Sequence, residues 1–365
     1  MLEGRTRVAR RPSIGLTVAL TLFLTGVSSA SDRIVVLLGK VWSVSPEGQI
    51  ESFPYKFPAG SFGGVFGSTE PLPSPNSRWI VFSRDLDCTG YPFTECGNDL
   101  HLLEVESGRE RRITSFGQPR GAQYASVDVL MTVWSTDSRQ ILFSVVPGET
   151  SGAAEEWGHD LLVRKADYGF HIYDLATATI HSVTLPKDFQ FQAWLPDGSF
   201  LGAISKAPPC AEKLLKFRFG DTQGADVGAP NGSLDQVKVS SDGKWIIGYM
   251  DGGCQQPETA QLIKIDLSDM AATPVVPLAA WAENQWPDFS PDGDHISYVH
   301  QQDMVEGIYD ESLIVDGRSV YACHGSMNYK WVDERKVAAA CGNEVVVVDV
   351  ASRSVLSRVM VPPAH

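Results

Sequence analysis

Apolar and polar positions in this chain follow a unit that recurs six times: an apolar strand, a turn rich in Pro, Asp and Gly, and a second apolar strand. The clearest copy spans 289–299, where a Ser-Pro-Asp-Gly turn beginning at Ser290 separates the two apolar runs. The copies at 194–201 and 239–247 are close to it. Asp and Gly suit such turns because they tolerate positive φ or hydrogen-bond locally. A hairpin repeated in this way predicts a β-propeller, an all-β ring of similar blades.

The spacing of the hairpin turns indicates the number of blades. The turns begin at Asn76, Asp137, Asp197, Asp242, Asp292 and Asp333. Because a blade takes roughly 40–50 residues, the two longest intervals, of 61 and 60 residues, predict insertions rather than extra blades. The insertions lie at 84–98 and 147–169, after the second strand of their blades.

Two further strands follow each predicted hairpin. Runs of alternating polarity at 100–105, 261–267 and 345–350 are typical of half-buried third strands. More polar runs at 109–114 and 353–359 follow as fourth strands. Polar outer strands suit the exposed rim of a blade, where charge discourages edge-to-edge pairing.

Residues 33–54 form a partial unit at the start of the repeats. The runs at 33–38, 40–44 and 49–53 resemble second, third and fourth strands without a first. We therefore predict a single propeller over 31–365 with six or seven four-stranded blades, and seven is favoured. In the seven-bladed case a weakly marked strand closes the ring. In the six-bladed case the N-terminal strands pack outside it.

The Ser-Pro-Asp-Gly turn at Ser290, with degraded copies at the other five turns, resembles the repeat of the TolB-like (WD40-like) propeller family over roughly residues 70–360. The resemblance implies the propeller fold but no particular activity, because propellers carry many functions. TolB has an α/β domain before its propeller, and many relatives have a C-terminal serine peptidase. We expect neither here, because the repeats begin soon after residue 31, end close to His365, and include no Gly-x-Ser-x-Gly motif.

The first thirty residues have the pattern of an export signal. Four arginines precede an apolar stretch at 14–27, and small residues follow at 28–30. The apolar stretch is shorter than the roughly 20 residues of a membrane-spanning helix. We therefore expect residues 1–30 to be a cleaved signal peptide and the chain to reach the bacterial periplasm or the extracellular space. An uncleaved anchor is the alternative.

The net charge of the chain disfavours nucleic acid as a partner. It is −14, and removing residues 1–30, with four Arg and one Glu, makes it −17. Because phosphate backbones repel an acidic protein, we expect no nucleic-acid partner. No other stretch is apolar enough to span a membrane as a helix. The oligomeric state is not indicated by the sequence.

Six cysteines in an exported chain favour disulfides over metal thiolates. They are Cys88, Cys96, Cys210, Cys254, Cys323 and Cys341. By the alternation of strand directions all six lie on one face of the ring, where the second strand of each blade ends, and they form three neighbouring pairs in chain order. We call this face the stapled face.

Histidines on the same face could instead form a metal-binding or catalytic site. His101, His159, His300 and His324 are expected on the stapled face, where three or four imidazoles could bind a metal or supply a general base. No spacing motif supports a metal site, so we expect neither a metal nor another cofactor. Trp281 and Trp286 are expected in the core or at the rim. Stacking of a sugar on a tryptophan near the central opening is the alternative for them.

The two insertions contain the candidate binding residues. Tyr91 and Phe93 lie in the first insertion, Trp157 and His159 in the second, and His324 ends a fourth strand. Aromatic side chains dominate binding hot spots, and long loops in a compact fold are often functional.

Taken together, these patterns favour a non-enzymatic exported binding module that recognises a protein or another envelope component through the stapled face. The alternatives are a hydrolase or lyase that acts on a glycan or peptide at a histidine site on that face, and a purely structural assembly module.

Overall fold

The computed structural model describes part of the chain. The described residues are 32–57, 71–85, 97–116, 127–147, 168–186, 189–204, 213–218, 221, 223–228, 233–251, 261–275, 284–301 and 310–362. They all lie in one compact unit, Asp32–His365. No helix long and apolar enough to cross a membrane is found among them.

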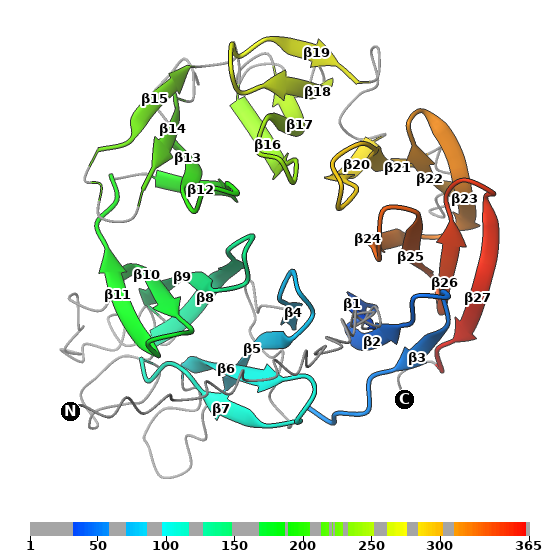
Figure 1. Ribbon diagram of the computed structural model, residues 1–365, viewed down its shortest axis with the longest axis horizontal. Helices are drawn as coiled ribbons and strands as arrows, with labels where there is room; N and C mark the ends of the chain where they lie inside the picture. The colour runs from blue at the N-terminus through cyan, green and yellow to red at the C-terminus, as the bar shows by residue number, and fades with distance from the viewer. Residues whose placement is uncertain are drawn as a thin grey trace, which may run out of the picture. The chain divides into compact units, whose positions relative to one another are not determined.

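Seven antiparallel sheets, here called blades 1 to 7 in chain order, are arranged in a ring whose centre we call the central channel (Figure 1). Blade 1 contains β1 (Arg33–Leu37), β2 (Lys40–Val44) and β3 (Ile50–Ser52). Blade 2 contains β4 (Leu72–Pro73), β5 (Trp79–Asp85), β6 (Asn98–Glu104) and β7 (Glu110–Arg112). Blade 3 contains β8 (Val127–Trp134), β9 (Gln140–Pro147), β10 (Gly169–Asp174) and β11 (Thr179–Val183).

The remaining four blades have four strands each. Blade 4 contains β12 (Phe189–Trp194), β13 (Phe200–Ile204), β14 (Lys213–Phe217) and β15 (Ala225–Gly228). Blade 5 contains β16 (Ser233–Val239), β17 (Trp245–Asp251), β18 (Gln261–Asp266) and β19 (Ala272–Pro274). Blade 6 contains β20 (Asn284–Phe289), β21 (Ile296–Gln301), β22 (Asp310–Val315) and β23 (Arg318–His324). Blade 7 contains β24 (Met327–Trp331), β25 (Lys336–Cys341), β26 (Glu344–Asp349) and β27 (Ser354–Met360).

The predicted all-β propeller is confirmed, and seven is the number of blades. Each of the six predicted hairpin turns joins the first and second strands of a blade. Blade 1 lies between blades 7 and 2 (Figure 1), so the alternative in which the N-terminal strands pack outside a six-bladed ring is wrong. The prediction of four strands per blade holds for six blades. Blade 1 has three described strands, and β1 itself packs beside β24 and β4.

Serine hydroxyls hold the turns between first and second strands. The hydroxyl of Ser240 donates to Asp242 Oδ1 at 2.7 Å and accepts the backbone N–H of Trp245 at 3.0 Å. A Ser and an Asp two residues apart thus satisfy the backbone of a tight turn, which explains why this pair marks the repeat. Neighbouring turns also bind each other, since the N–H of Asn76 in blade 2 donates to Ser138 Oγ in blade 3 at 3.0 Å.

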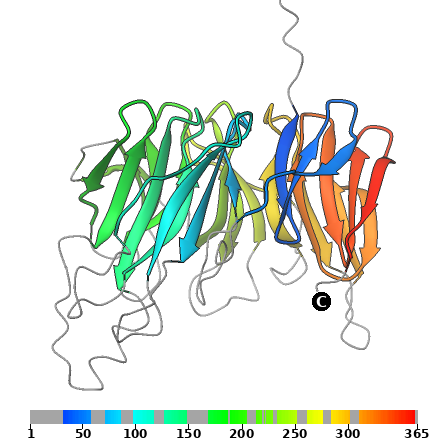
Figure 2. The same cartoon turned by 90° about the horizontal axis from the view of Figure 1, so that it is seen from below.

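An apolar cluster fills each of the seven interfaces between neighbouring blades. The strand β26 shows how the sequence builds them. Val345 and Val347 pack toward blade 1, whereas Val346 and Val348 pack toward blade 6. Because successive side chains of a strand point to opposite faces, a run of four valines serves two interfaces at once. The strands cross between the two faces of the ring (Figure 2), and their innermost members form the channel wall.

Candidate functional site

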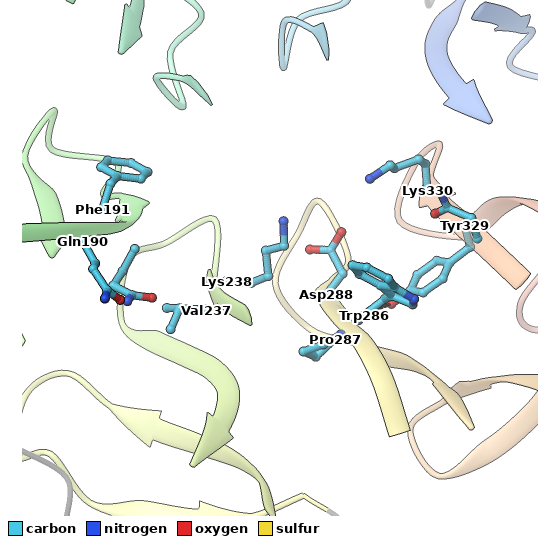
Figure 3. A pocket seen from close by; sticks show the side chains of 11 residues that line it. Gln190, Phe191, Val237, Lys238, Trp286, Pro287, Asp288, Tyr329 and Lys330 are labelled. Carbon is cyan, nitrogen blue, oxygen red and sulfur yellow. Dashed lines mark hydrogen bonds between the residues drawn. The ribbon is translucent and has the colours of Figure 1, made fainter. Parts of the chain in front are cut away.

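A pocket of about 440 Å³ opens on the wall of the central channel (Figure 3). The first strands of four consecutive blades, β12, β16, β20 and β24, supply its lining. We call it the channel pocket. Its lining residues are Gln190, Phe191, Gln192, Val237, Lys238, Trp286, Pro287, Asp288, Asn328, Tyr329 and Lys330. The volume lies in the range of roughly 300–1,000 Å³ that is typical of small-ligand sites.

β-Bulges shape the lining of the pocket. The pairing register shifts within β12, within β16 and within β20, and in each strand the shift falls at or beside the residues that line the pocket. An extra residue in one strand bends that strand and redirects its side chains. The repeated bulges therefore turn side chains of the innermost strands toward the channel, where a regular strand would direct alternate side chains into the interfaces between blades.

Trp286 is the most unusual residue of the pocket. Its backbone has a φ of 57°, in the left-handed region that bulky residues rarely adopt. Its side chain is 56% exposed, although most large apolar side chains of the blades are buried. Strained backbone of this kind persists only where the surrounding structure enforces it, and it concentrates at functional sites.

A buried hydrogen-bond network enforces this conformation from the neighbouring blade. The Tyr329 hydroxyl donates to the carbonyl of Trp286 at 2.6 Å and lies 2.9 Å from Ser297 Oγ. Ser297, fully buried on β21, donates to the carbonyl of Asp288 at 3.2 Å and accepts the indole N–H of Trp331 at 2.8 Å. Burial, followed by the nearby Asp288 charge, raises the pKa of Tyr329 well above its ordinary value. The tyrosine therefore stays protonated and keeps donating across the whole physiological pH range.

The pocket carries a net positive formal charge in an acidic protein. Lys238 and Lys330 are exposed in its lining, and Asp288 is half-buried between them in the view of Figure 3. Two ammonium groups and one carboxylate give a formal charge of +1, whereas the whole chain has −14. No ion pair of Lys238 occurs among the described residues. The site can therefore attract an anionic group.

One of the three predicted disulfide pairs lies within the described residues. Cys323 and Cys341 are bonded, with 6.3 Å between their Cα atoms. The bond joins the end of the fourth strand of blade 6 to the end of the second strand of blade 7, as predicted. Cys88, Cys96, Cys210 and Cys254 lie outside the described residues.

Of the five predicted binding residues, only His324 is described. It is exposed at the end of β23 and pairs through Nδ1 with Asp310. Tyr91, Phe93, Trp157 and His159 lie outside the described residues.

The histidines that are described lie in different surroundings. His101 is buried in blade 2, where its Nδ1 is 2.6 Å from Glu110 Oε1. Burial lowers the pKa of His101, with a smaller opposing effect of Glu110. Glu110 also binds the hydroxyl of Tyr55, and burial together with this carboxylate raises the pKa of Tyr55 to about 12. Among the described residues no group of three or more His, Cys, Asp or Glu side chains is arranged to hold a metal ion.

No pattern in the sequence predicted the channel pocket. The expectation of Trp286 as an ordinary core or rim residue is wrong, because the bulge holds it at the channel wall. A signal was present in the chain. Pro287 interrupts an otherwise apolar first strand, and a proline inside a strand marks a bulge or an edge.

No protein-family model matches this chain, and no curated protein matches it in sequence. Solved structures do match. TolB from Acinetobacter baumannii is 14% identical over 83% of this chain and 65% of its own, with a TM-score of 0.48. The acylaminoacyl peptidase of Pyrococcus horikoshii is 12% identical over 89% of this chain and 49% of its own, with a TM-score of 0.52. The dipeptidyl peptidase 4 of Porphyromonas gingivalis is 11% identical over 87% of this chain and 48% of its own, with a TM-score of 0.47.

These likenesses concern the fold. The seven blades confirm the propeller fold that the resemblance implies, and the Pyrococcus horikoshii peptidase shares that fold. The chain spans about two thirds of the TolB protein and about half of each peptidase.

Proposed function

We propose that this chain is an exported binding protein with a TolB-like propeller fold, which holds part of an envelope component in its channel pocket. The observation that carries this proposal is the exposed Trp286, fixed by the hydrogen bond from Tyr329. A large aromatic side chain in a rigid, partly polar pocket is a typical binding hot spot. Because the network fixes the pocket in advance, little conformational entropy is lost when a ligand binds.

Export is supported by the disulfide and by the pattern of residues 1–30. Disulfides such as Cys323–Cys341 persist in oxidising compartments such as the periplasm and the cell exterior. The proposal therefore places the mature protein in the bacterial periplasm or outside the cell, where an envelope protein or another envelope component is its partner.

The stapled face extends the proposed binding surface. The two insertions follow the second strands of blades 2 and 3, which end at Asp85 and Pro147. Cys341 likewise ends the second strand of blade 7. Since strand directions alternate, these three positions share one face of the ring. We propose that the partner contacts the insertion residues Tyr91, Phe93, Trp157 and His159 on this face, together with His324, while one of its segments enters the channel.

Affinity capture from an envelope extract tests the proposal with matched variants. Trp286→Ala removes the proposed anchor in the channel, and Val355→Ala removes another exposed apolar side chain on the outer strand β27. The wild type and Val355→Ala should capture the same partner in the same amount, whereas Trp286→Ala should lose it. Circular dichroism establishes that both variants are folded. Equal capture by folded Trp286→Ala would overturn the channel as the binding site.

A further inference from the structure

We infer that the group bound in the channel pocket is an anionic sugar residue of an envelope glycan. This inference rests on the proposed channel site and names its ligand. Four features of the pocket lead to it: a closed strand edge, a set of amides with no partner among the described residues, a net positive charge and an exposed indole.

The backbone of β20 is closed to an added peptide strand. Peptides commonly bind at a free strand edge through main-chain hydrogen bonds. In β20, however, the carbonyls of Trp286 and Asp288 already accept from Tyr329 and Ser297. Pro287 has no N–H, and the N–H of Phe289 donates to the Asp288 carboxylate at 3.0 Å. Recognition along residues 286–289 therefore depends on side chains.

Three amide side chains line the pocket with no partner among the described residues. Gln190 and Asn328 are exposed, and Gln192 is half-buried. Each amide offers donors and an acceptor. This matches the hydroxyl groups of a sugar, which donate and accept at the same time. An acyl chain or an aliphatic peptide side chain could not use these groups.

The charge of the pocket selects an acidic sugar over a neutral one. Lys238 and Lys330 approach from blades 5 and 7, on either side of Asp288 of blade 6 (Figure 3). A carboxylate or sulfate on the sugar would pair with the ammonium group of Lys238, and Lys330 adds to the positive charge of the pocket. Charge-assisted hydrogen bonds of this kind are about twice as strong as neutral ones.

The exposed Trp286 supplies the apolar surface that a sugar ring needs. Pyranose rings have C–H faces that pack on the flat side of an aromatic ring, and the indole combines such a surface with a polar edge. The rigid bulge keeps this surface in the channel before any ligand binds. The four features together fit an acidic sugar better than an extended peptide.

Isothermal titration of the full-length mature protein tests the inference. The probes are a hexuronate tetrasaccharide, a sulfated hexose tetrasaccharide, the neutral hexose tetrasaccharide of the same linkage, and an acetylated, amidated tetraglutamate peptide. At least one of the two anionic oligosaccharides should bind, and the neutral one should bind at least tenfold more weakly. Whether the carboxylate or the sulfate form binds identifies the anionic group. Equal binding of the neutral oligosaccharide, or binding of the peptide alone, would overturn the assignment.

Lysine variants connect the binding to this pocket without disturbing its core. Lys238→Met should weaken the binding of the anionic oligosaccharide about tenfold, which corresponds to about 1.4 kcal/mol. Lys330→Met should weaken the binding as well. Lys40→Met, an exposed lysine of β2 outside the pocket, is the matched control and should bind as the wild type does. An unchanged affinity in both pocket variants would contradict the inference.

The failure of this inference is distinguishable from failure of the proposed function. If capture of the partner depends on Trp286 while no oligosaccharide binds, the channel is the binding site and its ligand is not an acidic sugar. If capture does not depend on Trp286, the proposed site itself is wrong.

Discussion

The hydroxyl of Tyr329 donates a hydrogen bond to the carbonyl of Trp286, at 2.6 Å, from blade 7 to blade 6. This contact links a buried side chain to a strained backbone position whose own side chain lies in the channel. A residue between two blades thereby determines the shape of the proposed binding surface.

Removing the Tyr329 hydroxyl should loosen the bulge. Tyr329→Phe leaves the Trp286 carbonyl without this donor, and we expect a loss of about 1–3 kcal/mol in the free energy of unfolding. Urea denaturation measures it. Tyr321→Phe is the control, because Tyr321 has no hydroxyl partner among the described residues and should change stability little. Equal effects of the two substitutions would show that the contact with Trp286 has no special importance.

Loss of the disulfide between blades 6 and 7 should destabilise the ring. Cys323 and Cys341 are 18 residues apart, so the chain-entropy treatment gives about 3 kcal/mol for the bond. The double variant Cys323→Ser, Cys341→Ser leaves no free thiol of the pair and should unfold at a lower temperature in calorimetry. Peptide mapping of the wild type should recover the Cys323–Cys341 bridge, and its absence would contradict this part of the account.

Gly202 should not tolerate a larger side chain. A Cβ at this position would lie 1.9 Å from Cε2 of Phe189, which is buried in the interface between blades 3 and 4. Gly202→Ala should cost about 1–3 kcal/mol through overpacking. Adding Phe189→Leu creates space for the methyl group. The double variant should therefore lose less unfolding free energy than the two single variants lose in sum. Strict additivity in chemical denaturation would rule out this explanation.

Stability at mildly acidic pH should depend on His101. Burial lowers the pKa of His101 from its ordinary value near 6.5, so the unfolded chain takes up a proton at this site before the folded chain does. The stabilisation of the folded state by the neutral His101 side chain is therefore fully present above about pH 6.5 and is lost as the pH falls through the lowered pKa. His101→Gln should flatten this part of the curve of unfolding free energy against pH. An unchanged pH dependence in the folded His101→Gln variant would contradict the assignment to His101.

The fold could be predicted because its signals are local. Each turn of the Ser290 type satisfies its own backbone with its own side chains, and the valines of β26 show burial on both faces of a strand directly in the sequence. Cys323 and Cys341 could be paired because alternating strand directions place both residues at the same face. These features need no information from distant parts of the chain.

The channel pocket could not be predicted in the same way. It combines residues from four blades. The orientation of Trp286 depends on its contact with Tyr329, which is 43 residues away in the chain, and on the contact between Asp288 and Ser297, which are 9 residues apart. The sequence around Pro287 indicates an irregular strand, but not that its tryptophan turns into the channel. Hydrogen bonds from Tyr329 of blade 7 and from Ser297 of blade 6 determine that direction, and the sequence around Pro287 does not encode them.

Site-specific photo-cross-linking in the native envelope tests the central claim most directly. A photoreactive residue at Gln192 reports contacts inside the channel pocket, and the same residue at Val355 reports contacts on the outer strand of blade 7. The account predicts one specific adduct from position 192, lost when Trp286→Ala is added, and no such adduct from position 355. The same adduct from both positions, or its persistence without Trp286, would contradict the claim that the channel pocket binds the partner.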